Sequence, residues 1–374
     1  MSERCVAFTG GGTGGHIYPG LAVAAELRKV FGGRIVWLGS KKGSDRAPVE
    51  AAGLEYIALP SGKLRRELSL ENVADAFRVV AGYFAAKRVL RQLRPMLIFS
   101  KGGYVSVPPC RAAAALGIPV FTHESDLSPG LATRLNAAKA EKILVAWEET
   151  RDGLPAAARA RVEVVGNPMR AAILEGDAGR GRSLLGVPSG MPVVLAMGGS
   201  QGALQVNRLV EGALQALRDR AFVVHQTGET VVESGVDVAG SGLGPAFENY
   251  RRFAFIGEEL PDIMAAADMV IGRAGAGALQ EASALAKPMI LVPLAGTGTR
   301  GDQVDNARHF EKKGAAKVLL GDDARPEALA SAILAWLDAP ETARAAGAAA
   351  AALVRKDSAA QIARLIIQRI GAQA

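Results

Sequence analysis

Short apolar runs alternate with helical patterns along most of the chain, and this alternation limits the possible folds to a small set. In the first part of the chain, apolar runs bounded by turn residues occur at 5–8, 35–38, 96–100, 120–123 and 142–146. The pattern restarts after Asn167-Pro168, with runs at 193–196, 222–226, 253–256, 269–271 and 289–292. Such runs are typical of buried parallel strands, and the helical stretches between them complete βαβ units. The sequence therefore predicts an α/β protein with two doubly wound domains and a cleft between them.

The boundary between the two domains is predicted at Gly166-Asn167-Pro168. Pro168 disfavours helix at the residue before it, and a glycine permits unusual torsions. A chain of 374 residues also has the length of two domains. We expect an N-terminal domain at 1–165, a second domain at 166–354, and a C-terminal helix at 355–374. The apolar residues of this last stretch have helical spacing, so it is expected to pack on a neighbour, with the N-terminal domain as the candidate.

Charge is divided unevenly between the halves. The chain has a net charge of +7, but residues 1–165 contain 23 Lys/Arg against 15 Asp/Glu, and the rest contains 21 against 22. A one-sided basic excess indicates a polyanionic partner: nucleic acid, an anionic membrane surface or a phosphorylated substrate. Aromatic residues are only 5%, which disfavours a nucleic-acid binder. No uninterrupted apolar stretch of ~18 residues occurs, so we expect a soluble or peripheral intracellular protein.

Residues 70–93 predict an apolar and basic helix. One side carries Val73, Ala76, Phe77, Val80 and Phe84, flanked by Arg78, Lys87, Arg88 and Arg91. Two interpretations are open. The apolar side either faces a core, as in an ordinary amphipathic helix, or adheres to an anionic membrane.

The first chemical motif is the glycine run 10–15, which lies between a predicted strand and a helix predicted from about Pro19 to Val30. Glycines allow a ligand to approach backbone amides closely, and a helix N-terminus attracts anions. The run is not a P-loop, and the acidic residue of a dinucleotide site is absent at Leu38-Gly39-Ser40, so a dinucleotide-dependent oxidoreductase is a distant alternative. His16 follows the run and is either a general base or a ring that positions the loop.

Three further motifs occur in the second half. The loop 198–203 repeats the strand–loop–helix arrangement, and Ser200 is a candidate donor of a hydrogen bond to a phosphate. Residues 272–281 begin a helix with small residues, which suits a pyrophosphate, and Glu281 is either a ribose ligand or a solvated carboxylate. Gln303 is either a reader of sugar hydroxyls or part of a helix N-terminus.

A last motif, His123-Glu124-Ser125-Asp126, follows a predicted strand at the edge where α/β sheets bind ligands. The segment 100–104 ends the preceding strand and should lie beside it. The chain has no Asp-x-Asp and no clustered Cys/His set, so no metal or other cofactor is expected.

Six of these motifs, in order, resemble the MurG family of bacterial N-acetylglucosaminyltransferases that act in peptidoglycan synthesis. The resemblance covers about residues 5–320. The matching segments are 11–20, 100–106, 123–126, 165–170, 198–203 and 302–307.

The resemblance implies a GT-B fold with an acceptor-binding, membrane-facing N-terminal domain and a C-terminal domain for UDP-N-acetylglucosamine. The implied reaction is inverting transfer of N-acetylglucosamine to the C4 hydroxyl of undecaprenyl-diphospho-N-acetylmuramoyl-pentapeptide. It takes place peripherally at the cytoplasmic face of the bacterial membrane, without cofactor, metal or nucleic acid. The runner-up is a related enzyme that acts on diacylglycerol or another lipid or small acceptor.

The same resemblance assigns roles to residues of the matching motifs. The implied donor-binding residues are Thr13, Gly14, Gly15, Arg170, Ser200, Gln201, Ile256 (uracil, through its backbone), Ala276, Gly277, Glu281 and Gln303. The implied acceptor-binding residues are Gly12, Thr13, His16, Tyr104, Glu124 and Asp126. The base is His16 or Asp126. Many relatives carry Asn at the latter position, and an ionised carboxylate cannot donate a hydrogen bond. Asp126 therefore either accepts one from a sugar hydroxyl or competes with His16 for the proton.

Overall fold

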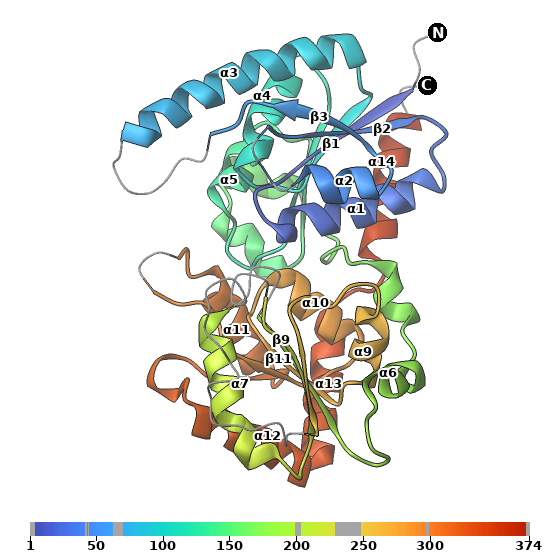
Figure 1. Ribbon diagram of the computed structural model, residues 1–374. Helices are drawn as coiled ribbons and strands as arrows, with labels where there is room; N and C mark the ends of the chain where they lie inside the picture. Colours follow the sequence, from blue (N-terminus) through green and yellow to red (C-terminus); the bar gives the residue numbers. More distant parts are fainter. Residues whose placement is uncertain are drawn as a thin grey trace. The chain divides into compact units, whose positions relative to one another are not determined.

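The computed structural model divides into two compact units, each a parallel sheet with helices on both faces (Figure 1). It describes residues 4–41, 43, 45–62, 70–198, 203–228, 248–296 and 299–371. The first unit is Met1–Met169 with Arg355–Ala374, and the second is Arg170–Val354. The segment Gly166–Pro168 therefore belongs to the first unit, and the chain crosses directly after Met169.

In its described residues the first unit has a seven-stranded sheet of order β3-β2-β1-β4-β5-β6-β7. The strands are β1 (Cys5–Thr9), β2 (Arg34–Ser40), β3 (Glu55–Leu59), β4 (Leu97–Ser100), β5 (Val120–Glu124), β6 (Lys142–Val145) and β7 (Val162–Val164). All neighbouring pairs are parallel. The strand order reverses between β1 and β4, so the loops after these two strands flank the switch point where such sheets bind ligands.

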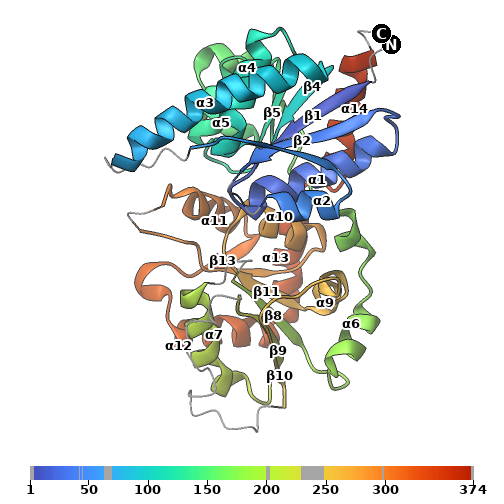
Figure 2. The same ribbon diagram turned by 45° about the horizontal axis from the view of Figure 1, so that its top comes forward.

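Helices cover both faces of this sheet. They are α1 (Gly14–Arg28), α2 (Arg46–Ala51), α3 (Leu70–Leu93), α4 (Val107–Ala115), α5 (Leu131–Ala137) and α14 (Ser358–Gly371), with short 3-10 turns at Tyr104–Ser106, Glu148–Gly153 and Ala156–Arg161. Side chains alternate along β1: Val6 and Phe8 pack toward α1 and α14, whereas Cys5 and Ala7 pack toward α3 and α4. Figure 2 shows α14, coloured red, beside α1 in the first unit.

The described part of the second unit has a six-stranded sheet of order β10-β9-β8-β11-β12-β13. Its strands are β8 (Val193–Met197), β9 (Phe222–Gln226), β10 (Tyr250–Phe253), β11 (Met269–Gly272), β12 (Met289–Leu291) and β13 (Ala316–Val318). Its helices are α6 (Ala178–Leu185), α7 (Leu204–Leu217), α9 (Leu260–Ala266), α10 (Ala276–Ala284), α11 (Asp302–Lys312), α12 (Pro326–Asp338) and α13 (Pro340–Leu353), with 3-10 turns at Ala171–Glu175 and Gly321–Asp323. The switch point lies between β8 and β11.

Two local expectations differ from the structure. The predicted strand 253–256 is displaced: β10 ends at Phe253, and Ile256 lies in the loop after it. Helix α1 begins at Gly14, not near Pro19, because Thr13 is extended and the glycines after it already form the first turn. His16 is therefore a helical residue.

The apolar side of α3 that the sequence indicates does not face the core. Phe77, Val80 and Phe84 are 73%, 54% and 63% exposed, whereas Ala86 and Leu90 are buried. The side chains of Val73 and Ala76 lie outside the described residues. Figure 1 shows the N-terminal half of α3 extending past the edge of the sheet. No helix in the described part of the chain is long and apolar enough to cross a membrane.

Candidate active site

The glycine loop after β1 is built around a buried carboxylate. The Gly12 N–H donates to Asp45 Oδ1 at 3.1 Å, and Asp45 is fully buried. A Cβ atom at Gly11 would lie 2.2 Å from Asp45 Oδ2, so only glycine fits there. Gly12 has φ +91°, a region that glycine adopts readily. The side chain of Asp45 therefore takes the place beside this amide that a ligand anion takes in phosphate-binding loops.

His16 lies in the first turn of α1, half-buried, against the loop that follows β4. Its Nδ1 is 3.2 Å from the carbonyl oxygen of Lys101. Because a carbonyl oxygen only accepts hydrogen bonds, we assign the proton to Nδ1, which leaves the basic lone pair on Nε2. Gly103 fits closely beside the ring, since a Cβ atom there would lie 3.0 Å from His16 Cδ2 and 2.3 Å from the Gly11 carbonyl oxygen.

Tyr104 joins the same cluster from the other side of the glycine loop. A Cβ atom at Gly12 would lie 2.7 Å from Tyr104 Cε1, so the ring packs directly on this glycine. Burial, and then the Asp45 carboxylate, raise the pKa of Tyr104, so its hydroxyl keeps its proton at neutral pH. The structure thus brings together Gly12, His16 and Tyr104, three of the residues expected to bind the acceptor.

Glu124, another expected acceptor residue, is engaged with its own loop. The side chain is 4% exposed. Its Oε1 accepts the N–H groups of Ser125 and Asp126 at 2.9 and 3.2 Å, and its Oε2 accepts that of Gly130 at 3.0 Å. Glu124 thereby shapes the loop that carries Asp126, which is itself half-buried.

In the second unit, Arg170 and Glu281 lie side by side. Arg170 Nε and Nη2 donate to the two carboxylate oxygens of Glu281 at 3.0 and 3.1 Å. Glu281 is in the second turn of α10, and its side chain is 15% exposed. Two residues expected to contact the nucleotide therefore form a pair in which each orients the other.

Ile256 also has an internal partner. Its N–H donates to Gln226 Oε1 at 3.0 Å, and both residues are buried. Gln226 ends β9, next to His225. That imidazole is fully buried between the Tyr250 hydroxyl and Asn207 Oδ1, both at 3.1 Å. Burial lowers the pKa of His225 to about 4.

Gln303 is oriented by the backbone. Its Oε1 accepts the Leu294 N–H at 2.9 Å, so its amide NH2 is the part directed away from that bond. Gln303 is the second residue of α11, and Ala276 and Gly277 form the start of α10. Two expected donor-binding residues, Ser200 and Gln201, lie outside the described residues.

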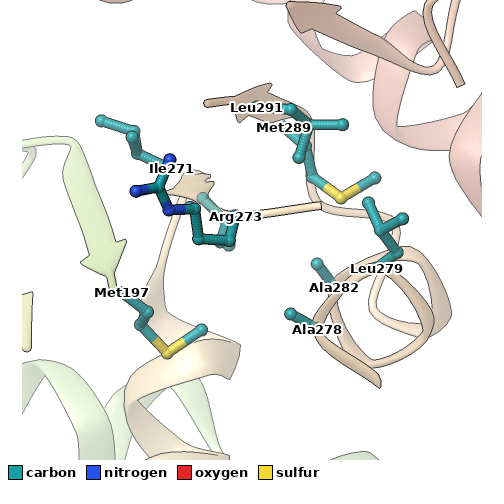
Figure 3. A pocket seen from close by; sticks show the side chains of 10 residues that line it. Met197, Ile271, Arg273, Ala278, Leu279, Ala282, Met289 and Leu291 are labelled. Carbon is teal, nitrogen blue, oxygen red and sulfur yellow. The ribbon is translucent and has the colours of Figure 1, made fainter. Parts of the chain in front are cut away.

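A small apolar cavity lies beneath the start of α10. It is lined in part by Met197, Arg273, Leu279 and Met289, whose side chains surround it in Figure 3. Its volume of about 20 Å³ has room for one water molecule and not for a nucleotide. Arg273 contacts both the start of α7 and the residue after β12, with Nη1 donating to Gln205 Oε1 at 2.8 Å and to the Val292 carbonyl at 2.9 Å.

Comparison with known proteins decides the family. Residues 6–145 match the glycosyltransferase family 28 N-terminal domain, and residues 193–365 match the corresponding C-terminal domain. A UDP-N-acetylglucosamine--N-acetylmuramyl-(pentapeptide) pyrophosphoryl-undecaprenol N-acetylglucosamine transferase from Treponema denticola is 48% identical over 87% of this chain and 86% of the relative. Identically named proteins from Treponema pallidum (strain Nichols) and Staphylococcus carnosus are 45% identical (92% of this chain, 89% of the relative) and 39% identical (85% and 85%). The chain belongs to the MurG family.

Solved structures agree with this family at the level of the fold. Acinetobacter baumannii MurG has a TM-score of 0.75 at 24% identity, covering 98% of this chain and 99% of that one. The calicheamicin glycosyltransferase CalG4 has a TM-score of 0.71 at 19% identity, covering 99% of each chain. The two Rossmann-like units are therefore those of a GT-B glycosyltransferase, as MurG membership requires.

Two positions outside every sequence motif hydrogen-bond to a predicted residue or its loop. Asp45 contacts Gly12 across 33 positions of the chain, and Gln226 contacts Ile256 across 30. Lys101 lies within the motif 100–106, but its contact with His16 spans 85 positions, and no local pattern signals it. Among the described residues, no group of three His, Cys, Asp or Glu side chains is arranged to hold a metal ion.

Proposed function

We propose that this protein transfers N-acetylglucosamine from UDP-N-acetylglucosamine to the C4 hydroxyl of undecaprenyl-diphospho-N-acetylmuramoyl-pentapeptide, with inversion. The observation that carries the proposal is the 48% identity over nearly the whole length of a relative named for this reaction. A GT-B fold alone would not decide the acceptor, because one fold supports many activities. The side-chain arrangement in both units is compatible with the reaction.

In this proposal the first unit binds the acceptor and removes its proton. His16 suits the role because the Lys101 carbonyl holds Nδ1, which makes Nε2 the nitrogen that carries the basic lone pair. Asp126, in the loop shaped by Glu124, is the competing base. The C4 oxygen attacks the anomeric carbon while the bond from that carbon to UDP breaks, and the base takes the hydroxyl proton.

The second unit binds the donor and stabilises the leaving UDP. The first turn of α10, with Ala276 and Gly277, directs backbone N–H groups and a helix dipole toward the diphosphate. Glu281, oriented by Arg170, accepts the ribose hydroxyls, and the Ile256 backbone binds the uracil. Gln303 donates its amide to the sugar, since its oxygen is already bound. We assign the phosphate contacts of the glycine loop to Ser200 and Gln201.

We further propose that α3 holds the enzyme on an anionic membrane surface at the cytoplasmic face. Phe77, Val80 and Phe84 follow a 3-4 spacing along one exposed side, and Arg88 and Arg91 continue the same side toward the C-terminus of the helix. An exposed apolar row followed by arginines matches a surface with an acyl interior and anionic headgroups. The lipid-linked acceptor lies in such a surface.

The reaction is tested with radiolabelled UDP-N-acetylglucosamine and either the lipid-linked muramoyl acceptor or diacylglycerol. We expect label to enter the muramoyl lipid only, with one UDP released per transfer. His16→Ala should lower turnover by ~10²-fold or more while Asp126→Asn has a smaller effect. Transfer to diacylglycerol instead, or saturable binding of NADH without the UDP-sugar, would reject the proposal in favour of one of the two alternatives.

Membrane binding is tested by flotation with vesicles of anionic or neutral lipid. The double variant Phe77→Ser, Phe84→Ser should bind more weakly to anionic and to neutral vesicles. The double variant Arg88→Gln, Arg91→Gln should bind more weakly to anionic vesicles only. Val30→Ser is a matched control, because Val30 is also 65% exposed but lies beyond the C-terminus of α1. An equal loss of vesicle binding in the Val30 variant, or no loss of vesicle binding in the α3 variants, would contradict the role proposed for α3.

A further inference from the structure

Lys101 is a fully buried cation at the end of β4, with 1% of its surface exposed. Its Nζ donates to Ser125 Oγ at 2.6 Å, and Ser125 Oγ donates to Asn167 Oδ1 at 2.6 Å. The chain of bonds runs from the switch point of the first sheet, through the residue before Asp126, to Asn167, shortly before the chain enters the second unit. All three residues are buried.

The backbone of Lys101 is tied to the other half of the site. Its N–H donates to the Thr9 carbonyl at 2.8 Å, which fixes it to the strand that leads into the glycine loop. Its own carbonyl accepts the hydrogen bond of His16 Nδ1. One residue therefore contacts both segments that carry a candidate base.

Burial of the ammonium costs free energy because the charged group loses its hydration. An apolar side chain of the same length would fill the space without that loss. Its hydrogen-bond acceptor here is a neutral hydroxyl, so charge compensation comes from the carboxylates of Glu124 and Asp126. Burial lowers the pKa of Lys101 to about 8, and the two carboxylates oppose that shift. The remaining titratable neighbour, His123, is buried, and the Lys101 charge contributes to lowering its pKa.

We propose that Lys101 is a positioning residue for proton transfer, holding His16 through its carbonyl and the Asp126 loop through its ammonium. The role rests on the proposed function, since it concerns the base of that reaction. Its positive charge also favours the deprotonated form of a base on this side of the sheet. In the sequence, Lys101 is only one residue of the segment 100–104. Its proposed positioning role follows from the hydrogen bonds that connect it with segments next to β1 and β5.

The test compares Lys101→Met, Ser125→Ala and the exposed control Lys139→Met in full-length protein. Lys101→Met should lower kcat by ~10-fold or more and leave the KM for UDP-N-acetylglucosamine unchanged, because Lys101 is in the first unit. Loss of the cation should also move the acid limb of the kcat/KM profile to higher pH, because the base then binds its proton more tightly. Ser125→Ala retains the charge, so kcat should fall while the acid limb stays in place.

A merely structural role predicts a different pattern, namely lower thermal stability with kcat per folded molecule and the acid limb both unchanged. That result for Lys101→Met would overturn the proposal. If Lys101→Met does not fold, Ser125→Ala decides: wild-type kcat in that variant overturns the proposal, and a reduced kcat in folded protein supports it. A wild-type protein that transfers nothing to the muramoyl lipid would instead refute the proposed function, before any variant is compared.

Discussion

Arg170 and Glu281 form a two-pronged ion pair in the second unit, with N–O distances of 3.0 and 3.1 Å. The chain separates them by 111 positions, and each is expected to contact the nucleotide. The pair fixes the plane of the Glu281 carboxylate, which is the orientation that a ribose diol requires from a two-oxygen acceptor.

Loss of this carboxylate should weaken donor binding. We expect Glu281→Ala to raise the Kd for UDP by ~10-fold or more, because a hydrogen bond to a charged group contributes about 1.5–3 kcal/mol. Calorimetry with UDP measures the change. Arg180→Ala is the matched control, since Arg180 forms an equally two-pronged pair with Asp262 in the same unit. Comparable losses in both variants would indicate a general effect on the unit.

Gln226 should compete with the base of the nucleotide. Its Oε1 occupies the Ile256 N–H, so a uracil that binds this N–H must displace it. Gln226→Ala should therefore tighten UDP binding by roughly 5-fold, equivalent to about 1 kcal/mol for one internal hydrogen bond. Weaker binding in this variant would mean that Gln226 holds the Ile256 loop in its binding conformation.

Glu124 should contribute mainly to the stability of the first unit and little to acceptor binding. Glu124→Gln exchanges one acceptor oxygen for an NH2 group that faces backbone donors, so the free energy of unfolding should fall by about 2 kcal/mol. Denaturant unfolding measures this value, with the exposed Glu50→Gln as control. A raised KM for the muramoyl acceptor at unchanged stability would assign Glu124 to ligand binding instead.

His225 should make the protein sensitive to acid. Its pKa is about 4 in the native state and near 6.5 when unfolded. As the pH falls from 6.5 toward 4, the unfolded chain takes up a proton that the native state does not, so stability falls, by on the order of 3 kcal/mol in all. Unfolding across this range should depend less on pH in His225→Gln than in wild type, and His309→Gln should behave as wild type. Equal pH dependence in all three proteins would contradict this account.

Deprotonation of Lys101 at alkaline pH should change the stability and the activity of the protein in opposite directions. Its native pKa of about 8 lies below the unfolded value near 10.4, so between these values the unfolded chain holds the proton that the native state releases. The free energy of unfolding of the wild type, relative to Lys101→Met, should therefore rise with pH from 8 to 10. Wild-type activity should fall over the same range as the ammonium is lost. If the free energy of unfolding and the activity rose together or fell together over this range, the positive charge assigned to Lys101 would be contradicted.

Local patterns in the amino-acid sequence predicted the two α/β halves, the C-terminal helix and the loops that we propose carry the site. Apolar runs and glycine-rich turns are local patterns, and the Glu124 and Glu281 motifs sit at strand ends and helix starts that such patterns locate. The family resemblance, since confirmed by the comparisons, came from motifs of the same kind.

The contacts between these side chains, by contrast, follow from the folded arrangement and not from local patterns. Asp45 beneath Gly12, Lys101 behind Ser125, and Gln226 on Ile256 are contacts between segments far apart in the chain, made where parallel strands bring their carboxyl ends to one edge. The exposure of Phe77 and Phe84 was likewise undecided, because an amphipathic period shows that a helix has an apolar side but not what covers it. Burial and hydrogen bonding depend on neighbours in space, which a periodic pattern along the chain does not specify.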